Sequence, residues 1–402
     1  MDMNRAAKYI FSVVLLLIPA ACFAGQFEFS GYAKSFVHYQ HSNIASSDSW
    51  TLTNPWALKL SYVPREYLSF NLTYVISPHW NSPAVLFDEP GLSVAGQNRF
   101  KDLDARIWPE ASDDPKKLSL WHNLDRAYVR ISANWVDLYL GRQPIAWGSA
   151  RFANPTDIVA PYGFRELDTE DRIGVDAARV NIPLGQMSEI GLGFIAGKDF
   201  DMENSTLYLR PKFYLMKTDL ALVLMEFKKN RLYGIDISRS LGGAGVWMEA
   251  GYIDFEETSE NALRLSVGAD YKLSDKTYAF GEYHFNGFGE LNASDYTKNY
   301  LKQAYSEKAV YLMAQNYLTL GFNYQLTPLI NSGTQPIVNL DDISVVLNQQ
   351  FEYNLTQNSY LSYGFFKGLG KGTDKTLTGL IQIGSEFGSY PDIYYLSYRK
   401  YF

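Results

Sequence analysis

The chain has 402 residues, of which 36 are basic and 43 acidic, giving a formal net charge of −7. This acidic balance excludes the basic footprint of a nucleic-acid-binding protein, and a single cysteine excludes a disulfide framework or a thiolate metal cluster. Aromatic residues make up 15% of the chain, with 30 tyrosines, yet the mean hydropathy is only −0.19.

The first residues, 1–24, predict a cleaved secretory signal peptide. A positively charged start precedes an apolar run over residues 9–21, and Ala24 supplies a small residue at the cleavage site. The run is shorter than the roughly 20 residues that a membrane-spanning helix needs. Processing at Cys22, which would make a lipoprotein, is the alternative. We therefore expect residues 25–402 to form the mature chain after secretion across the inner membrane.

The remainder of the chain alternates between apolar and polar side chains instead of forming long apolar runs. The pattern is clearest over residues 262–273, and residues 55–63 and 67–76 repeat it. A strand with lipid on one face and water on the other has this period of two. Because lipid offers the backbone no hydrogen-bond partners, such strands must close into a barrel.

The alternation predicts one all-β domain over residues 25–402, a transmembrane antiparallel up-and-down β-barrel. An even strand number is the rule for bacterial barrels. We count eighteen strands, with sixteen as the alternative, at residues 27–39, 55–63, 67–76, 124–133, 135–141, 173–182, 188–197, 205–215, 219–227, 231–239, 245–253, 262–273, 277–285, 317–326, 332–340, 343–353, 358–367 and 392–402.

The connections between these strands alternate between short and long. Tight turns, which we expect on the periplasmic side, are predicted at residues 64–66, 133–134, 217–219, 274–276 and 356–358. Long polar segments, which we expect on the extracellular side, lie near residues 77–123, 142–172, 286–316 and 368–391. A short helix is predicted within the third of these loops.

The segment 142–172 is the densest polar stretch, and its Pro and Gly residues prevent a regular strand. Its charges are too numerous to face lipid. One interpretation is that the loop folds inward and narrows the lumen, where opposing rows of Arg and carboxylate groups select solutes by charge. The alternative is an extracellular loop held together by its own ion pairs.

The strand predicted at 124–133 places Arg126, Tyr128 and Arg130 on one face. These arginines must point into the lumen, because Arg facing lipid near the bilayer midplane costs about 2–4 kcal/mol. A lumenal row of cations favours anionic solutes, whereas ion pairs that stiffen the barrel are the alternative. The complete set of predicted pore-lining or constriction residues is Arg126, Tyr128, Arg130, Asp137, Tyr139, Arg142, Arg151, Arg165, Glu166, Asp168, Asp171, Asp176 and Arg179.

Aromatic residues near strand ends predict the two interfacial girdles of a membrane barrel. Tyr128, Tyr139 and Tyr208 are instead predicted to face the lumen, where stacking on sugars is the alternative role. The girdle prediction covers Trp56, Trp135, Trp247, Tyr252, Tyr278, Tyr394 and Tyr395.

Signals of an enzyme are weak. The five histidines have no zinc-ligand spacing on a common element. His41-Ser42-Asn43 is superficially similar to the catalytic cluster of outer-membrane phospholipases, but adjacent strand residues point to opposite faces. We expect no catalytic residues, no metal and no cofactor.

The chain resembles a set of poorly characterised Gram-negative outer-membrane β-barrel proteins of the porin kind, over most of its mature length. The resemblance implies a barrel in the outer membrane but no substrate. Where such proteins often have Gly after Asp342, this chain has Ile343, which disfavours a tight turn. The matching stretches are Gly141-Arg142-Gln143, Trp147-Gly148, Asn154-Pro155-Thr156-Asp157, Gly174-Val175-Asp176-Ala177, Pro183-Leu184-Gly185, Asn339-Leu340-Asp341-Asp342, Gly384-Ser385-Glu386-Phe387-Gly388 and the terminal Tyr401-Phe402.

These patterns predict an outer-membrane porin that passes small polar or anionic solutes by diffusion. The terminal Phe402 resembles the signal read by the barrel assembly machinery, although Lys400 departs from it. Membrane lipid, lipopolysaccharide and the assembly machinery are the expected partners, and a homo-oligomer is left open by the sequence. The alternatives are a scaffold for polysaccharide export or for sheathing an electron-transfer cytochrome, and an outer-membrane hydrolase.

Overall fold

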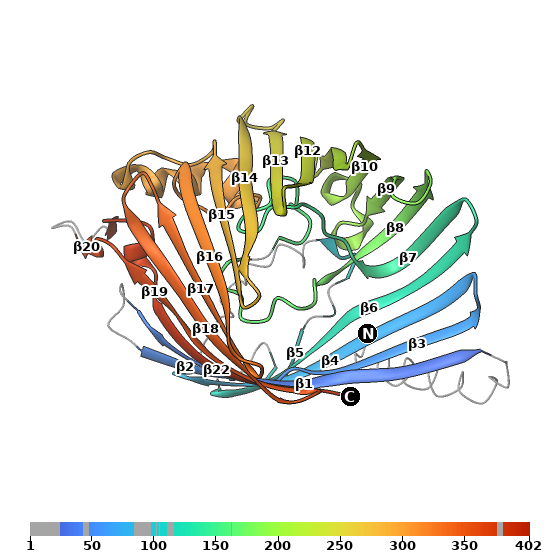
Figure 1. The fold of residues 1–402 in the computed structure, drawn as a ribbon, viewed down its shortest axis with the longest axis horizontal. Helices are drawn as coiled ribbons and strands as arrows, with labels where there is room; N and C mark the ends of the chain where they lie inside the picture. The colour runs from blue at the N-terminus through green and yellow to red at the C-terminus, as the bar shows by residue number, and fades with distance from the viewer. Residues whose placement is uncertain are drawn as a thin grey trace.

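The computed structural model describes residues 25–42, 48–83, 98–101, 103, 105–110, 116–161, 163–375 and 381–402. The predicted signal peptide, including Cys22, and Asn43 lie outside these residues. Among the described residues, eighteen strands form a closed antiparallel β-barrel (Figure 1). They are β1 (Gln26–His41), β3 (Trp56–Arg65), β4 (Leu68–Ser82), β6 (Leu118–Ala133), β7 (Val136–Pro144), β8 (Gly174–Pro183), β9 (Glu189–Ile195), β10 (Thr206–Leu215), β11 (Thr218–Phe227), β12 (Asn230–Leu241), β13 (Ala244–Asp254), β14 (Asn261–Ser274), β15 (Thr277–Asn286), β16 (Asn316–Thr327), β17 (Ile330–Asn339), β18 (Ser344–Thr356), β19 (Ser359–Leu369) and β22 (Asp392–Tyr401).

Every predicted strand corresponds to one of these eighteen, so the predicted count of eighteen is confirmed and sixteen is wrong. The barrel closes where the first strand, β1, pairs with the last, β22. Two further strands accompany the wall at one rim: β2 (Asp48–Thr53) pairs with β1 and β4, and β5 (Ala105–Trp108) pairs with β6. The hairpin of β20 (Thr373–Lys375) and β21 (Ile381–Ile383) forms a separate small sheet.

The two faces of each strand differ as the alternation predicts. On β14, Leu263, Val267 and Tyr271 are 43–48% exposed on the outer surface. Between them, Arg264 and Ser266 are buried inside the barrel. The outer surface is therefore apolar, and polar side chains fill the interior.

Short turns lie at the end of the barrel that holds both ends of the described chain, and long loops lie at the other end. Two-residue turns follow β3, β6, β10 and β14 at the short-turn end. The long loops span residues 83–117, 145–173, 287–315 and 370–391, close to the predicted ranges. No helix of the described residues is long and apolar enough to cross a membrane.

In the described residues, helical structure lies in the third and fourth long loops and in the connection between β9 and β10. The predicted helix in the third long loop appears as a 3-10 helix, η4, and the α-helical turn α2. The helical segments are η2 (Lys198–Phe200), η3 (Met202–Asn204), η4 (Ala293–Leu301), α2 (Gln303–Ser306) and η5 (Phe387–Ser389).

The turn between β17 and β18 forms despite the absence of glycine. Ile343 adopts a φ of 58°, in the left-handed region, and its side chain is 73% exposed. An L-residue in this region is strained by roughly 1–2 kcal/mol, and β-branched residues are the least suited to it. The turn that the sequence disfavoured therefore does form, and Ile343 adopts a strained backbone conformation in it.

Replacing Ile343 with glycine is expected to relieve this strain and to raise the free energy of unfolding by about 1 kcal/mol. Denaturant-induced unfolding of the barrel in detergent measures the change. Ile343→Ala is the control, because alanine removes the branched side chain but retains a Cβ in the left-handed region. An equal gain from alanine and glycine would contradict the explanation.

Candidate functional site

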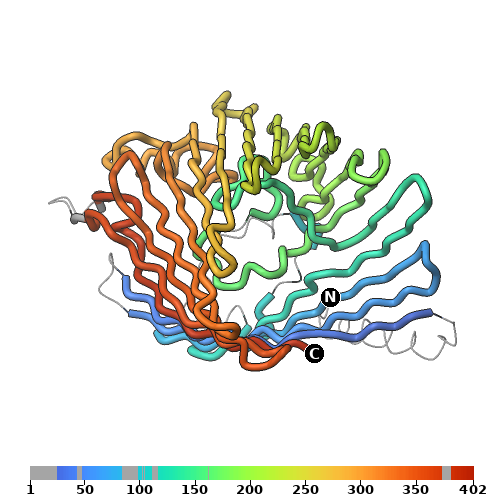
Figure 2. The backbone as a smooth tube through the Cα atoms, viewed as in Figure 1, coloured from blue at the N-terminus to red at the C-terminus, as the bar shows by residue number. Residues whose placement is uncertain are grey.

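The loop between β7 and β8, residues 145–173, folds into the barrel and is called here the lumen loop. Figures 1 and 2 show its path across the interior. Of the two interpretations of this segment, the structure shows the inward fold. Its first half lies against β12–β15, and its second half reaches β1, β3, β6 and β22 on the other side.

Two buried carboxylates of the wall hold the first half of the lumen loop. Glu282 of β15 accepts hydrogen bonds from the backbone N–H groups of Arg151 (2.6 Å) and Phe152 (3.0 Å). Glu249 of β13 accepts the backbone N–H of Thr156 at 2.9 Å and its hydroxyl at 2.7 Å. Both carboxylates are at most 1% exposed. Hydrogen bonds to charged acceptors in such surroundings are strong, so the loop backbone is fixed in place.

Arg151 adds a side-chain attachment to the same wall. Its guanidinium forms an ion pair with Asp270 of β14. It also lies over the rings of Trp247 (4.9 Å), Tyr278 (5.5 Å) and Phe280 (5.7 Å). Both the charge and the planar face of Arg151 are thus engaged by the wall.

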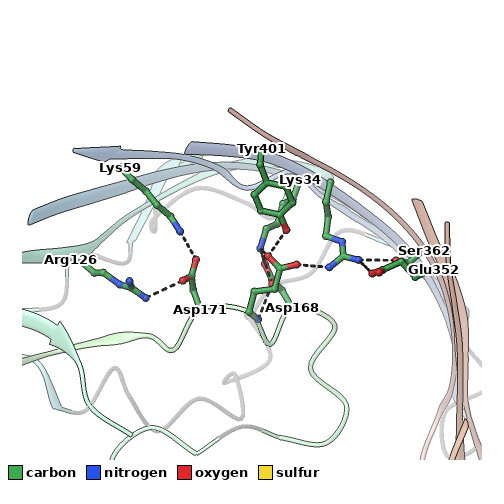
Figure 3. Close-up of polar contacts among 10 residues, drawn as sticks. Lys34, Lys59, Arg126, Asp168, Asp171, Glu352, Ser362 and Tyr401 are labelled. Carbon is green, nitrogen blue, oxygen red and sulfur yellow. Dashed lines mark hydrogen bonds and ion pairs between the residues drawn. The ribbon is translucent and has the colours of Figure 1, made fainter. Parts of the chain in front are cut away.

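The loop tip, residues 168–171, carries three carboxylates that meet cations of the opposite wall (Figure 3). Lys34 Nζ on β1 lies 2.8 Å from carboxylate oxygens of both Asp168 and Glu170. Asp171 binds Lys59 of β3 at 2.9 Å and Arg126 of β6 at 3.1 Å. Glu170 additionally forms an ion pair with Arg399 and accepts a hydrogen bond from Tyr401, both on β22.

These partners keep the loop tip charged. Burial alone raises the pKa of Asp171, but the hydrogen bond from Lys59 and the charges of Lys59 and Arg126 outweigh it and lower the pKa below its ordinary value. Burial likewise opposes ionisation of Glu170, whose pKa is nevertheless lowered by Lys34 and Tyr401. The second half of the loop is therefore held by charge-assisted contacts.

A row of cations and tyrosines lines the wall next to the lumen loop. Arg130 of β6, Tyr139 of β7 and Arg179 of β8 are direct cross-strand neighbours. The guanidinium of Arg179 lies 4.2 Å from the centre of the Tyr139 ring, and that of Arg130 lies 5.6 Å away. Arg130 also pairs with Asp137 at 3.1 Å, and the Tyr128 ring lies 6.3 Å from Tyr139. Within the described residues, Arg179 has no carboxylate partner.

Arg142 and Asp176 form a pair on β7 and β8 that contacts residues 100 and 101 of the first long loop. Arg142 is only 4% exposed and binds Asp176 through two hydrogen bonds of 2.8 Å. It also donates to the backbone carbonyl of Leu124 at 2.9 Å. This pair ties β7 and β8 together and joins them to residues 100 and 101.

Arg165 and Glu166 lie near the extracellular loops. Arg165 stacks over Tyr390 at 4.6 Å. Glu166 accepts the backbone N–H of Gly163 at 3.0 Å, and burial raises the pKa of its carboxyl group. Arg165 thus connects the lumen loop to the fourth long loop, and Glu166 fixes the turn of the lumen loop that begins at Gly163.

The sequence prediction missed the wall residues that hold the loop. A signal existed, since a carboxylate within a membrane strand must face the lumen. Their loop partners, however, lie between 87 and 231 residues away in the chain, and alternation carries no information about such pairs. The missed residues are Lys34, Lys59, Asp236, Glu249, Asp270, Glu282, Arg399 and Tyr401, together with Glu352, which binds Arg399.

Three girdle predictions are wrong. Trp247 donates to Glu282 inside the barrel, Tyr278 contacts Arg151, and Tyr395 is 7% exposed and packs on Phe366. The contacts that hold these three rings inside the barrel come from residues distant in the sequence. Their aromatic character alone therefore did not show whether they face the lumen or the outside. Large exposed surfaces agree with the girdle prediction for Trp56, Trp135, Tyr252 and Tyr394.

The weak enzyme signal gains no support from the geometry. His41 lies at the rim of the barrel, where its Nδ1 is 2.7 Å from Oδ1 of Asp48. In the part of the chain that the structure describes, no group of three His, Cys, Asp or Glu side chains is placed to hold a metal ion.

No protein-family model and no curated protein matches this chain. Solved structures do match. Acinetobacter baumannii OccAB4 aligns with a TM-score of 0.56 at 9% identity, over 94% of this chain and 98% of that chain. Pseudomonas aeruginosa OccK9 (OpdG) gives 0.55 at 9% identity over 94% and 98%, and Pseudomonas aeruginosa OccD3 (OpdP) gives 0.53 at 10% over 93% and 91%.

At such identities the likeness concerns the fold alone. The chain has the porin-type fold, a closed antiparallel barrel of eighteen strands. In this chain a long loop between β7 and β8 crosses the lumen.

Proposed function

We propose that this protein is a passive outer-membrane channel for small polar solutes, with a preference for anions. The apolar exterior matches a hydrocarbon environment, and the polar interior matches a water-filled path. Lipid and lipopolysaccharide around the barrel, and the barrel assembly machinery acting on its C-terminal strand, are part of this proposal. The single observation that carries it is the lumen loop, anchored to both sides of the wall, since such a loop sets the width of a pore.

A cavity of about 310 Å³ supports a solute path along this side of the lumen loop. It lies between residues 146–149 of the lumen loop and the wall. Arg210 and Lys212 of β10 line it, together with Asp219 and Asp236. Cations thus lie beside a space that is large enough for a small solute.

The predicted site residues divide into two roles under this proposal. Width is set by the residues that hold the loop, including Arg126, Arg151, Asp168 and Asp171. Charge selection falls to the wall cations Arg130, Arg179, Arg210 and Lys212, with Tyr128 and Tyr139 beside them. Arg179 matters most, because it faces the interior without a carboxylate partner among the described residues, and unneutralised cations attract anions.

Reversal potentials in planar bilayers with a KCl gradient test the proposal. We expect anion preference in the native channel and a smaller preference after Arg179→Gln. Arg231→Gln is the control, because Arg231 is 54% exposed near the rim and lies outside the proposed path. A native channel that prefers cations, or one that gives no conductance steps, would contradict the proposal.

The scaffold alternative receives no support from the interior. Loop residues and wall residues pack into two apolar clusters inside the barrel, one around Ile158, Val175 and Phe255 and the other around Phe152 and Tyr317. This packing occupies space that an enclosed cytochrome would need.

A further inference from the structure

The seam of the barrel, where β1 pairs with β22, carries an unfavourable charge arrangement. The two strands pair from Tyr32 opposite Tyr401 to His41 opposite Asp392. Within this register, Lys34 lies directly opposite Arg399. Side chains directly opposite each other on one face of an antiparallel pair are close neighbours, and like charges in that arrangement are destabilising.

Water does not relieve this repulsion. Lys34 is 1% exposed, and the side chain of Arg399 is 14% exposed. A buried cation without a counter-charge is strongly destabilising, because it has lost its hydration without gaining a partner. The seam therefore needs acidic groups from elsewhere in the chain.

The loop tip supplies both carboxylates that bind Lys34 and one of the two that bind Arg399, and Glu352 of β18 is the other carboxylate on Arg399. Glu170 contacts both strands, since it lies 2.8 Å from Lys34 Nζ on β1 and binds Arg399 and Tyr401 on β22. Asp168 provides a second carboxylate 2.8 Å from Lys34, as Figure 3 shows. One side chain thus joins the first and last strands from inside the barrel.

We propose that the loop tip is an electrostatic staple that couples docking of the lumen loop to closure of the barrel. The β1–β22 seam is stable when Asp168 and Glu170 lie between its two cations, and it is weakened when they leave. The coupling is reciprocal, because a closed seam also creates the paired cations that bind the tip. This role concerns assembly and stability and does not depend on what the channel conducts.

Hydrogen exchange of the full mature barrel, in detergent and resolved by peptide, tests the staple. The double variant Asp168→Asn/Glu170→Gln removes both charges and keeps the side-chain shapes. We expect amides of β1 and β22 to exchange at least about tenfold faster, while β11–β14 keep the native rate, because breaking buried ion pairs is costly only where they lie. Unchanged exchange at the seam, or equal acceleration of all strands, would overturn the proposal.

Asp171→Asn is the matched control. It removes the same charge from the same tip, but its partners Lys59 and Arg126 lie on β3 and β6. We expect exchange of the seam to stay near the native rate in this variant. Acceleration of the seam equal to that of the double variant would show that loop anchoring alone matters and would overturn the staple.

Adding Lys34→Met to the double variant separates neutralisation from anchoring. Because this change removes one of the two opposing cations, we expect the triple variant to regain slow exchange at the seam. Failure to regain it would overturn the proposal. If the double variant does not assemble, the assembled fraction of the triple variant decides in the same way: recovery supports the staple, and continued failure contradicts it.

Discussion

Replacing Glu282 with alanine is expected to release the first half of the lumen loop and to raise the single-channel conductance. The carboxylate accepts the backbone N–H groups of Arg151, Phe152 and Ala153 and the indole N–H of Trp247. Each buried donor left without an acceptor costs about 1–3 kcal/mol. Losing the acceptor of four donors weakens the attachment of this half to the wall, and we expect the loop to be held less firmly and the pore to widen.

Conductance steps in planar bilayers measure this change, and unfolding in detergent measures the accompanying loss of stability. Glu282→Gln should give a smaller increase, because it keeps one acceptor oxygen. Asp275→Asn is the control, since Asp275 lies fully exposed in the turn after β14 and pairs only with Lys272, 2.7 Å away, among the ion pairs of the described residues. A conductance unchanged by Glu282→Ala would show that the loop does not limit the pore.

Raising the pH from 5 to 8 is expected to loosen the long loops around Glu386. This residue is 1% exposed, and burial raises the pKa of its carboxyl group to about 7. It joins two loops, because it accepts the backbone N–H of Met313 at 3.0 Å and the hydroxyl of Tyr390 at 3.1 Å. Neighbouring Asp342 also raises the pKa, whereas the hydrogen bonds from Tyr317 and Met313 lower it.

The direction of the effect follows from proton linkage. Since the folded pKa lies above the ordinary value of 4.5, the stabilisation is fully present below pH 4.5 and is lost as the pH rises through about 7. At 1.36 kcal/mol per pKa unit, the loss amounts to at most about 3 kcal/mol. Hydrogen exchange of residues 287–315 and 381–391 at the two pH values measures it.

Glu386→Gln should remove most of this pH dependence, because the amide is the nearest uncharged analogue of the protonated acid. Glu290→Gln is the matched control from the same region. Glu290 pairs with Lys302 at 2.7 Å and belongs to the third long loop, so its substitution should leave the pH dependence in place. Equal exchange at pH 5 and pH 8 in the native protein would contradict the prediction.

The strands of this barrel could be predicted because each one is a local pattern. On β14, Leu263 and Val267 face outward and Arg264 and Ser266 inward, and a period of two over about ten residues identifies both faces. The inward fold of residues 145–173 was one of two open interpretations, since so many charges cannot face lipid but can face either the lumen or the water outside the barrel.

The partners of those charges could not be predicted in the same way. Asp168 meets Lys34, which lies 134 residues earlier, and Arg151 meets Glu282, which lies 131 residues later. Which wall strand lies beside which loop residue depends on barrel curvature and loop path, and alternation records neither. For the same reason Trp247 was assigned to the membrane, although its indole faces a carboxylate inside.

The two anchorages of the lumen loop have a mechanical consequence. One lies on β12–β15 and the other on β1, β3, β6 and β22, on opposite sides of the barrel (Figure 2). The loop therefore connects two opposite parts of the thin barrel wall. Any force that flattens the cylinder into an ellipse along this direction has to stretch the loop between its two anchorages. Contacts within the chain itself therefore resist that deformation.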